Sequence, residues 1–352
     1  MTEKDKGLEQ RYSAWLTFLS KNGFEKKHAT LLTDYAVGLE KKQFPVIFEL
    51  EHLSKILGME YSLLSRMTGA NSYFYRDFKI KKRNGGTRTI QSPYPKLAYT
   101  QQWIKKHILD KICISDHAFA YAKGKSHIEN AKQHIGSGEL LKIDLVNFFD
   151  HIDFKSVYSI FFNCGYSEKV STQLAKLCTI WDRLPQGAPT SPVISNIILK
   201  EIDHEFSLFS AEHGLIYTRY ADDICISGQE ISLDFILNAK NIIESNGFLV
   251  NPEKTCLVKG SARKLITGVQ VNDFGVRAPK KLRREYRKSA YFLIKNNFSS
   301  LNGTLQPLNP TYIDEVYGKG QYILSIEPEN NKVIEYQLAL KKLKNKLMSS
   351  SS

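Results

Sequence analysis

The sequence predicts an α+β fold, in which helical stretches flank a central region of strands. Apolar residues recur at helical spacing between residues 8 and 70, which predicts a small helical N-terminal region. From Tyr73 the pattern changes to alternation and to short apolar runs, which are typical of strands. After Gly260 the sequence is strongly basic, and we expect helices to the end apart from a Gly/Asn/Pro-rich break near residues 302–310.

Three segments predict the central strands. "FKIKKRNGGTRTIQSP" alternates around a Gly-Gly pair and predicts a hairpin whose tip is Asn84-Gly85-Gly86. "ELLKIDL", residues 139–145, predicts a buried strand. "YTRYADDICI", residues 217–226, has strand-forming residues on both sides of two acidic residues, which predicts two strands joined by a turn.

Length and charge limit the class of protein. The 352 residues suffice for two or three domains. The 49 Lys and Arg against 36 Asp and Glu give a net charge of +13, which favours a nucleic acid partner over an anionic membrane. Five cysteines without any C-x-x-C pair indicate neither a disulfide framework nor a zinc site. Without an apolar leader or a run of about 18 apolar residues, we expect a cytoplasmic protein.

Three carboxylates are candidates for catalysis. Asp222 and Asp223 can approach one point only at a turn, because consecutive strand residues face opposite ways. Asp144 ends an apolar run, where an unpaired buried carboxylate is costly. A divalent cation shared by the three side chains removes that cost. The alternatives are an ordinary Asp-rich turn for the doublet, and a helix cap or a salt bridge to Lys for Asp144.

The order of the motifs resembles that of reverse transcriptases. "IDLVNFF", "LPQGAPTSP" and "YADD" resemble their motifs A, B and C, and "KKRNGGTRTI" resembles their fingers motif. The match covers roughly residues 73–272. It implies the right-hand polymerase fold, with fingers, an antiparallel-sheet palm and a helical thumb. We therefore expect a helical N-terminal region over residues 1–70, fingers over 71–140, a palm over 141–260 and a basic thumb over 261–352.

The resemblance implies the roles of the acidic residues. Asp144 and Asp222 would be the principal ligands of two Mg²⁺ ions, helped by the carbonyl of Leu145. Asp223 would complete the acidic cluster. Such a pair of ions activates an attacking hydroxyl and neutralises a leaving pyrophosphate. The implied enzyme is an RNA-directed DNA polymerase, a nucleotidyltransferase that takes dNTPs as substrates.

The resemblance also implies six residues that contact the incoming nucleotide: Lys82, Arg88, Phe149, Gln186, Gly187 and Lys254. Phe149 would lie under the sugar and exclude a 2′-OH, and Lys82 and Arg88 would close over the triphosphate. Lys254, in "VNPEKTCLV", resembles the lysine near the leaving phosphate. Taken singly, Phe149 could equally be core beside Phe148, and the basic residues could be solvated.

Two further motifs resemble those of bacterial retron reverse transcriptases. "NAKQH", which contains Asn130 and His134, resembles their N-A-x-x-H signature, and "ITG" at residues 266–268 resembles their V-T-G box. Without the catalytic motifs, a helix cap for Asn130 and a satisfied helix histidine for His134 would be preferred. The resemblance implies a cognate structured non-coding RNA, partly copied into DNA from an internal guanosine 2′-OH. The product is branched RNA–DNA, or msDNA.

The region for RNA recognition is expected in the basic C-terminal segment. "PKKLRREYRKSAYFLI" places apolar residues on one helical face and charged residues outside it. With the retron signature, we expect these residues to bind RNA: Asn130, His134, Lys280, Lys281, Arg283, Arg284, Arg287 and Lys288.

Several alternatives remain open at the level of sequence. One is a group II intron or diversity-generating enzyme, although maturase and endonuclease segments are absent. Another is a protein-primed or untemplated polymerase of the abortive-infection type. A third is a non-catalytic RNA-binding scaffold. Retron membership also suggests antiphage defence together with a separate effector protein.

Overall fold

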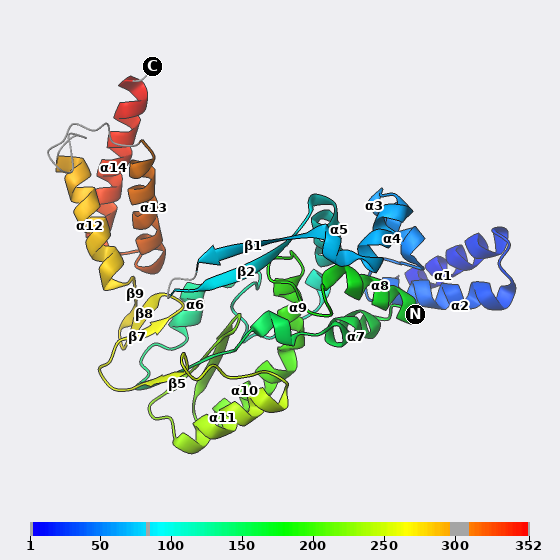
Figure 1. Ribbon diagram of the computed structural model, residues 1–352, viewed down its shortest axis with the longest axis horizontal. Helices are drawn as coiled ribbons and strands as arrows, with labels where there is room; N and C mark the ends of the chain where they lie inside the picture. Colours follow the sequence, from blue (N-terminus) through cyan, green and yellow to red (C-terminus); the bar gives the residue numbers. More distant parts are fainter. Residues whose placement is uncertain (1–2, 82–84, 296–309, 351–352) are drawn as a thin grey trace. The chain divides into compact units, whose positions relative to one another are not determined.

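The computed structural model describes residues 3–81, 85–295 and 310–350, and this part of the chain divides into two compact units (Figure 1). Unit 1 comprises Met1–Ala122, Leu145–Phe206 and Ala239–Asn251, and unit 2 comprises Lys123–Asp144, Ser207–Asn238 and Pro252–Ser352. Helices α10 (Lys200–Glu212) and α11 (Leu233–Ser245) each run from one unit into the other. The division expected from sequence, into an N-terminal region, fingers, palm and thumb, stays a prediction.

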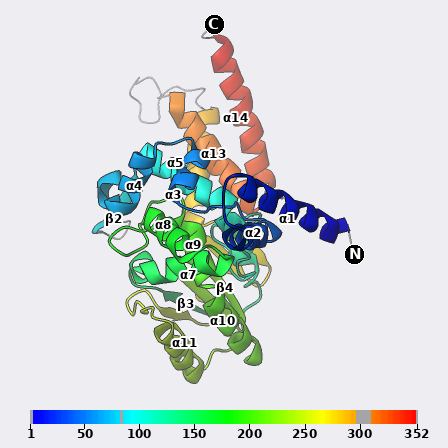
Figure 2. The ribbon, with the colours of Figure 1, turned by 90° about the vertical axis from the view of Figure 1, so that its right-hand side faces the viewer.

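The N-terminal part of unit 1 is helical, as predicted. Its helices are α1 (Glu3–Lys21), α2 (Lys26–Lys41), α3 (Leu50–Leu57) and α4 (Tyr61–Gly69). Figure 2 shows α1 and α2 as a packed pair. Helix α3 buries Leu50, Leu53 and Leu57, the helix-spaced apolar positions of the sequence, and it ends at Gly58 in the left-handed conformation.

The predicted hairpin of the fingers motif is confirmed. Strands β1 (Tyr75–Lys81) and β2 (Thr87–Pro93) are antiparallel, with Lys81 opposite Thr87. Gly85 and Gly86 at its tip have φ of 86° and 77°, which side chains rarely adopt. Asn84 and the predicted nucleotide ligand Lys82 lie outside the described residues.

Unit 1 also contains the helices α5 (Pro95–His107), α7 (Phe154–Cys164), α8 (Glu168–Cys178) and α9 (Ser191–Ile198). Side chains cap two of them, because Asp153 accepts from the Ser156 amide and Ser167 accepts from the Val170 amide. Short 3₁₀ turns occur at Asn71–Phe74, Leu109–Lys111 and Phe148–His151.

A four-stranded antiparallel sheet organises unit 2. Its order is β4-β5-β3-β6, formed by β4 (Ile216–Tyr220), β5 (Asp223–Gly228), β3 (Glu139–Asp144) and β6 (Cys256–Val258). The short helix α6 (His127–Lys132) packs against β4. The central strand β3 is buried at every position except Lys142, as the apolar segment predicted.

The expectation of continuous helix after Gly260 is wrong for residues 264–277. They form a three-stranded antiparallel sheet of β7 (Lys264–Ile266), β8 (Val269–Asn272) and β9 (Gly275–Arg277). The physical reason is local, because "VQVN" alternates and Gly268 and Gly275 supply turns with φ of 85° and 143°. The helices begin only at α12.

The basic C-terminal segment is a three-helix bundle of α12 (Lys280–Lys295), α13 (Pro310–Ile326) and α14 (Asn331–Ser350) (Figure 1). One apolar core joins this bundle to the small sheet, to α6 and to Leu140 of β3 and Cys225 of β5. The expected break near residues 302–310 falls almost wholly outside the described residues. Among the helices of the described chain, none is both long and apolar enough to span a bilayer.

Gly320 allows the close packing of the bundle. A Cβ there would lie 2.7 Å from Tyr286 Cε2 and would overlap the amide of Gln337, whose nitrogen donates to the Tyr317 carbonyl at 2.8 Å. We expect Gly320→Ala to lower the free energy of unfolding by about 2–4 kcal/mol, because overpacking and a broken buried hydrogen bond add.

Denaturant titration measures this change, and Gly318→Ala is the matched control. Gly318 lies in the same helix, and its Cβ would meet nothing within 4 Å. Alanine there should raise stability by about 0.5–1 kcal/mol through helix propensity. Equal effects of the two substitutions would contradict the packing argument.

Candidate active site

The acidic doublet lies at the turn between β4 and β5, as predicted. Tyr220 pairs with Asp223, so that Ala221 and Asp222 form a two-residue turn. Ala221 has a φ of 58°, in the left-handed region that tight hairpin turns require. Asp222 is therefore in the hairpin turn itself, and Asp223 is the first residue of β5 directly after it.

Asp144 lies beside this tip. It is the last residue of β3 and the direct antiparallel partner of Asp223. Directly opposed residues share a face of the sheet and have Cβ atoms about 5 Å apart. The pairing of β3 with β5 thus brings together carboxylates that are 78 positions apart in sequence (222 − 144).

The electrostatics of Asp223 follow from this convergence. Burial, reinforced by the charges of Asp222 and Asp144, raises the pKa of Asp223 to about 6. Lys142 and Lys254 oppose the rise. Negative charge is therefore concentrated at the tip, and a bound cation would relieve the repulsion.

Lys254 already supplies one cation. Its ammonium donates to both oxygens of Asp144, at 3.0 and 2.9 Å, while the Lys254 side chain remains 56% exposed. Lys254, which the sequence motif predicted to be a phosphate ligand, thus lies in the acidic cluster of unit 2. A phosphate that arrives there would compete with Asp144 for this ammonium.

The acidic cluster fits a divalent metal ion whose coordination shell is completed by the substrate. Among the described residues, no three His, Cys, Asp or Glu side chains are grouped so as to hold an ion by themselves. Magnesium is usually bound by one or two carboxylates together with water and substrate phosphates. Asp144, which already holds an ammonium on both oxygens, and the Asp222–Asp223 tip provide such a partial shell.

Arg219 supports the turn from the other face of the sheet, and the sequence analysis missed it. The side chain is fully buried, and its guanidinium donates to the Ala221 carbonyl at 3.1 Å. The signal that could have found it is an arginine in the interior of a predicted strand, because a buried cation must have partners. It fixes the strained residue that precedes Asp222.

A second group of predicted residues lies together in unit 1. The Gln91 amide of β2 donates to the Gln186 carbonyl at 2.8 Å, which fastens the "LPQG" loop to the fingers strand that carries Arg88. Gly187 has a φ of 130°, and a Cβ there would lie 2.9 Å from the Gln91 carbonyl oxygen. Only glycine allows this approach.

Phe149 and Leu145 are also in unit 1. Phe149 is partly exposed and packs against the buried Phe148, with ring centroids 5.1 Å apart, so the pair divides into a core ring and an accessible ring. Leu145 is buried and forms an isolated bridge with Val250.

Asn130 and His134 are buried in unit 2, with exposed fractions of 0% and 1%, so neither side chain contacts RNA as placed. His134 is hydrogen-bonded to two hydroxyls of the β4–β5 hairpin, Thr218 Oγ1 and Ser227 Oγ, both at 2.7 Å. The side-chain nitrogen and oxygen of Asn130 have no hydrogen-bond partner among the described residues. The two signature residues of "NAKQH", Asn130 and His134, are therefore both buried, whereas Lys132 and Gln133 between them are exposed.

Helix α12 has the amphipathic form that the sequence predicted. Tyr286, Ala290 and Leu293 are buried. The exposed basic face consists of Lys280, Lys281, Arg284, Arg287 and Lys288.

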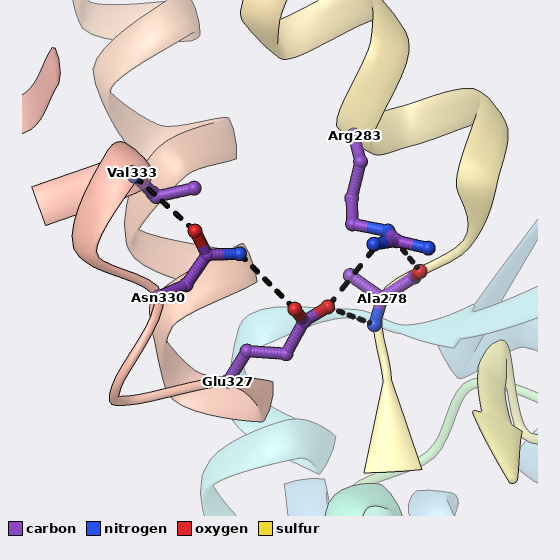
Figure 3. Close-up of polar contacts among 5 residues, drawn as sticks. All are labelled: Ala278, Arg283, Glu327, Asn330 and Val333. Atoms are coloured by element: carbon purple, nitrogen blue, oxygen red, sulfur yellow. Dashed lines mark hydrogen bonds and ion pairs between the residues drawn. The ribbon is translucent and has the colours of Figure 1, made fainter. Parts of the chain in front are cut away.

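Arg283 differs from this basic face (Figure 3). Its Nε donates to the Ala278 carbonyl at 3.1 Å and lies 3.9 Å from Glu327. Glu327 in turn accepts from the Ala278 amide and from Asn330. Arg283 therefore ties the start of α12 to the α13–α14 connection.

Comparisons with known proteins show the family of this chain. Residues 80–285 match the family model "Reverse transcriptase (RNA-dependent DNA polymerase)". The retron Ec86 reverse transcriptase of Escherichia coli is 30% identical over 306 residues, which cover 85% of this chain and 91% of that protein. The retron Mx162 reverse transcriptase of Myxococcus xanthus is 30% identical over 263 residues, or 65% of this chain and 54% of that protein.

Solved structures give more distant matches. A telomerase from Candida albicans, in complex with a fragment of telomeric RNA, is 13% identical with a TM-score of 0.44, over 77% of this chain and 59% of that one. A foamy viral protease-reverse transcriptase with double-stranded DNA is 12% identical with a TM-score of 0.42, over 77% of this chain and 43% of that one.

The family match and the acidic hairpin define the class of this protein. It is an RNA-directed DNA polymerase of the reverse transcriptase family, which confirms the predicted α+β, right-hand fold class and the predicted enzyme. Within that family, the chain belongs to the bacterial retron reverse transcriptases. Enzymes of this family generally use divalent metal ions.

Proposed function

We propose that this polymerase binds one cognate structured RNA and copies part of it into DNA from an internal guanosine 2′-OH, which yields branched RNA–DNA. The observation that carries the catalytic part is the convergence of Asp144 with the Asp222–Asp223 turn. The exposed basic face of α12, on a chain of net charge +13, supports the RNA part.

In this proposal, Asp144, Asp222 and Asp223 hold two Mg²⁺ ions, with the Leu145 carbonyl as a further ligand. The ions would supply charge neutralisation at the entering and leaving oxygens of the α-phosphate. The ammonium of Lys254 would exchange its contact with Asp144 for a contact with the leaving pyrophosphate. These residues position and neutralise, and the protein forms no covalent intermediate.

Unit 1 contains the residues proposed for nucleotide binding other than Lys254. Arg88 would grip the triphosphate as a bidentate fork, together with Lys82. Gln186 and Gly187 would contact the nucleotide and its template pair from a loop that β2 holds in place. The accessible ring of Phe149 would exclude the 2′-OH of a ribonucleotide.

Co-expression tests the proposal. The chain is expressed with the structured RNA encoded in the neighbouring DNA, and nucleic acid is analysed for DNA joined to RNA by a 2′,5′ link, which debranching enzyme cleaves. Branched product is expected only when both are present. DNA linked to a Tyr or Ser of the protein would instead indicate protein priming, and no incorporated dNTP at all would indicate a scaffold.

We further propose that the product serves antiphage defence together with a separate effector protein. Family membership alone supports this part. Its test is phage plating on cells that carry the complete neighbourhood, with Asp222→Asn as the inactive control. Equal protection by both forms would contradict a role for DNA synthesis.

The basic face of α12 is expected to engage RNA phosphates. Each phosphate contact contributes about 0.7–0.9 to the slope of log affinity against log salt concentration. Replacement of Arg284, Arg287 and Lys288 by Gln should therefore reduce that slope by about 2–3 and weaken binding at low salt. Fluorescence anisotropy with the labelled cognate RNA, across a KCl series, measures both.

The control carries the same change of charge at another site. Lys21, Lys26 and Lys27 are exposed at the α1–α2 turn of unit 1, and their triple Gln variant also loses three positive charges. Its salt slope should stay within about 0.5 of the original. An equal loss in both variants would indicate that net charge, and not the α12 face, binds the RNA.

A further inference from the structure

His134 connects both strands of the catalytic hairpin. One ring nitrogen lies 2.7 Å from Thr218 Oγ1 on β4, and the other lies 2.7 Å from Ser227 Oγ on β5. Ser137 adds to this cluster, because its hydroxyl lies 2.9 Å from Ser227 Oγ and 3.0 Å from the His134 carbonyl. The cluster is buried throughout, so each lost bond would leave an unpaired polar atom.

The cluster lies on the face of the sheet that carries the catalytic carboxylates. Thr218 is two residues before Tyr220, which pairs with Asp223, and Ser227 is four residues after Asp223. Residues separated by an even number along a strand share a face. Asp223 and its partner Asp144 lie at one end of this face of the sheet. His134 contacts the same face toward its other end.

The hairpin needs such a tie on its outer strand. In the order β4-β5-β3-β6, β4 is the edge strand and has sheet hydrogen bonds to β5 alone. The Thr218 bond to His134 fixes β4 from outside the sheet. Burial lowers the pKa of His134 to about 4, so the ring is neutral at pH 7 and can donate from one nitrogen and accept at the other.

Helix α6, which ends two residues before His134, is itself held by the C-terminal part of unit 2. The ring of His127, at the start of α6, stacks on Tyr322 of α13 with an interplanar angle of 7° and centroids 5.7 Å apart. Thr267, between β7 and β8, donates from its hydroxyl to the His127 carbonyl. After α6, the Gly136 amide donates to the Asn272 carbonyl. The segment that precedes and follows His134 is thus attached to the small sheet and to α13, in addition to its contacts with the hairpin.

We propose that His134 is a positioning residue, which sets the β4–β5 hairpin against β3 and thereby places Asp222 and Asp223 relative to Asp144. The proposal rests on the catalytic role proposed above for these carboxylates. A shift of the hairpin would weaken the joint hold on the metal, whereas Arg88, Gln186 and Gly187 belong to unit 1 and do not depend on this cluster.

The test uses the full-length chain on poly(rA)/oligo(dT) with dTTP, so that it does not depend on the cognate RNA. Thr218→Val and Ser227→Ala each remove one hydroxyl from the cluster. Each is expected to lower kcat per folded molecule by about tenfold and to raise the Mg²⁺ concentration for half-maximal rate severalfold. The KM for dTTP at saturating Mg²⁺ should change by less than about twofold.

Three controls separate positioning from general stability. Thr218→Ser keeps the hydroxyl and should retain most of the activity. His134→Gln keeps a donor and an acceptor and should retain more than His134→Leu. Thr33→Val removes a buried hydroxyl from α2 in unit 1, where it donates to the Ala29 carbonyl at 2.8 Å, and should leave the Mg²⁺ dependence unchanged.

The outcomes distinguish this inference from the proposed site. If Thr218→Val and Ser227→Ala keep both kcat and the Mg²⁺ midpoint within twofold, His134 is a core residue and the inference is overturned. The same holds if Thr218→Ser loses as much as Thr218→Val. If Asp222→Asn retains synthesis, the catalytic assignment itself fails. If Thr218→Val does not fold, Ser227→Ala decides alone.

Discussion

Asp222→Asn should abolish DNA synthesis, by about 10³-fold or more, with little change in stability. The substitution preserves shape at the hairpin turn and removes one negative charge from the tip where Asp223 and Asp144 converge. Because metal-assisted phosphoryl transfer depends on that charge, the rate should fall far more than any loss of a single hydrogen bond would explain. Steady-state dTTP incorporation on poly(rA)/oligo(dT) measures the effect.

The stability of the Asp222→Asn variant should not fall with its activity. Asp222 raises the pKa of Asp223 by repulsion, so its neutralisation should leave the free energy of unfolding unchanged or slightly higher. Asp273→Asn is the matched control, since Asp273 is exposed in the β8–β9 turn of the same unit. A mutant Asp222→Asn that synthesises DNA at more than a few per cent of the normal rate would show that the turn is not catalytic.

The strand segments of the site were predictable because their signals are local. Apolar alternation, a Gly-Gly tip and an acidic doublet between strand formers gave the fingers hairpin and the β4–β5 turn. The cost of an unpaired carboxylate at the end of an apolar run, and then the likeness to motifs A and C, predicted that Asp144 lies near the doublet, and Asp144 is paired with Asp223 in the sheet.

Buried polar contacts were not predictable, since they depend on distant partners. Arg219 supports the Ala221 carbonyl from the far face of the sheet, and nothing in its own neighbourhood names that role. His134 was expected at the RNA but is bonded inside the fold, because a family signature records a residue's presence and not its burial. Arg283 is basic, like the residues of the exposed face of α12, but its guanidinium contacts the Ala278 carbonyl and Glu327.

The three strands at residues 264–277 show a different limit. The basic composition and the helical pattern farther along the chain favoured helix for the whole region. Strands of three or four residues are too short to show a clear alternation of apolar and polar residues. Turn glycines were the better guide there, because Gly268 and Gly275 adopt backbone angles that helices exclude.

Gly187 offers the second large effect, because the "LPQG" loop depends on its lack of a side chain. The loop lies directly on β2, where the Gln91 amide donates to the Gln186 carbonyl. A Cβ on Gly187 would lie 2.8 Å from Ile90 Cγ2 and 2.9 Å from the Gln91 carbonyl oxygen. The backbone cannot yield as a flexible side chain does, so the loop itself must move away from the strand that carries Arg88.

We expect Gly187→Ala to lower kcat/KM for dNTP by about 10²-fold, mainly through a higher KM. Overpacking costs about 1–3 kcal/mol and the φ of 130° costs alanine about 1–3 kcal/mol more, while 10²-fold corresponds to about 2.7 kcal/mol. Gly275→Ala separates the two causes, because Gly275 has a similar φ of 143° with nothing within 4 Å of a Cβ. It should cost stability through φ alone and leave the KM for dNTP unchanged. An unaltered KM in Gly187→Ala, in a folded protein, would mean that this loop does not bind the nucleotide.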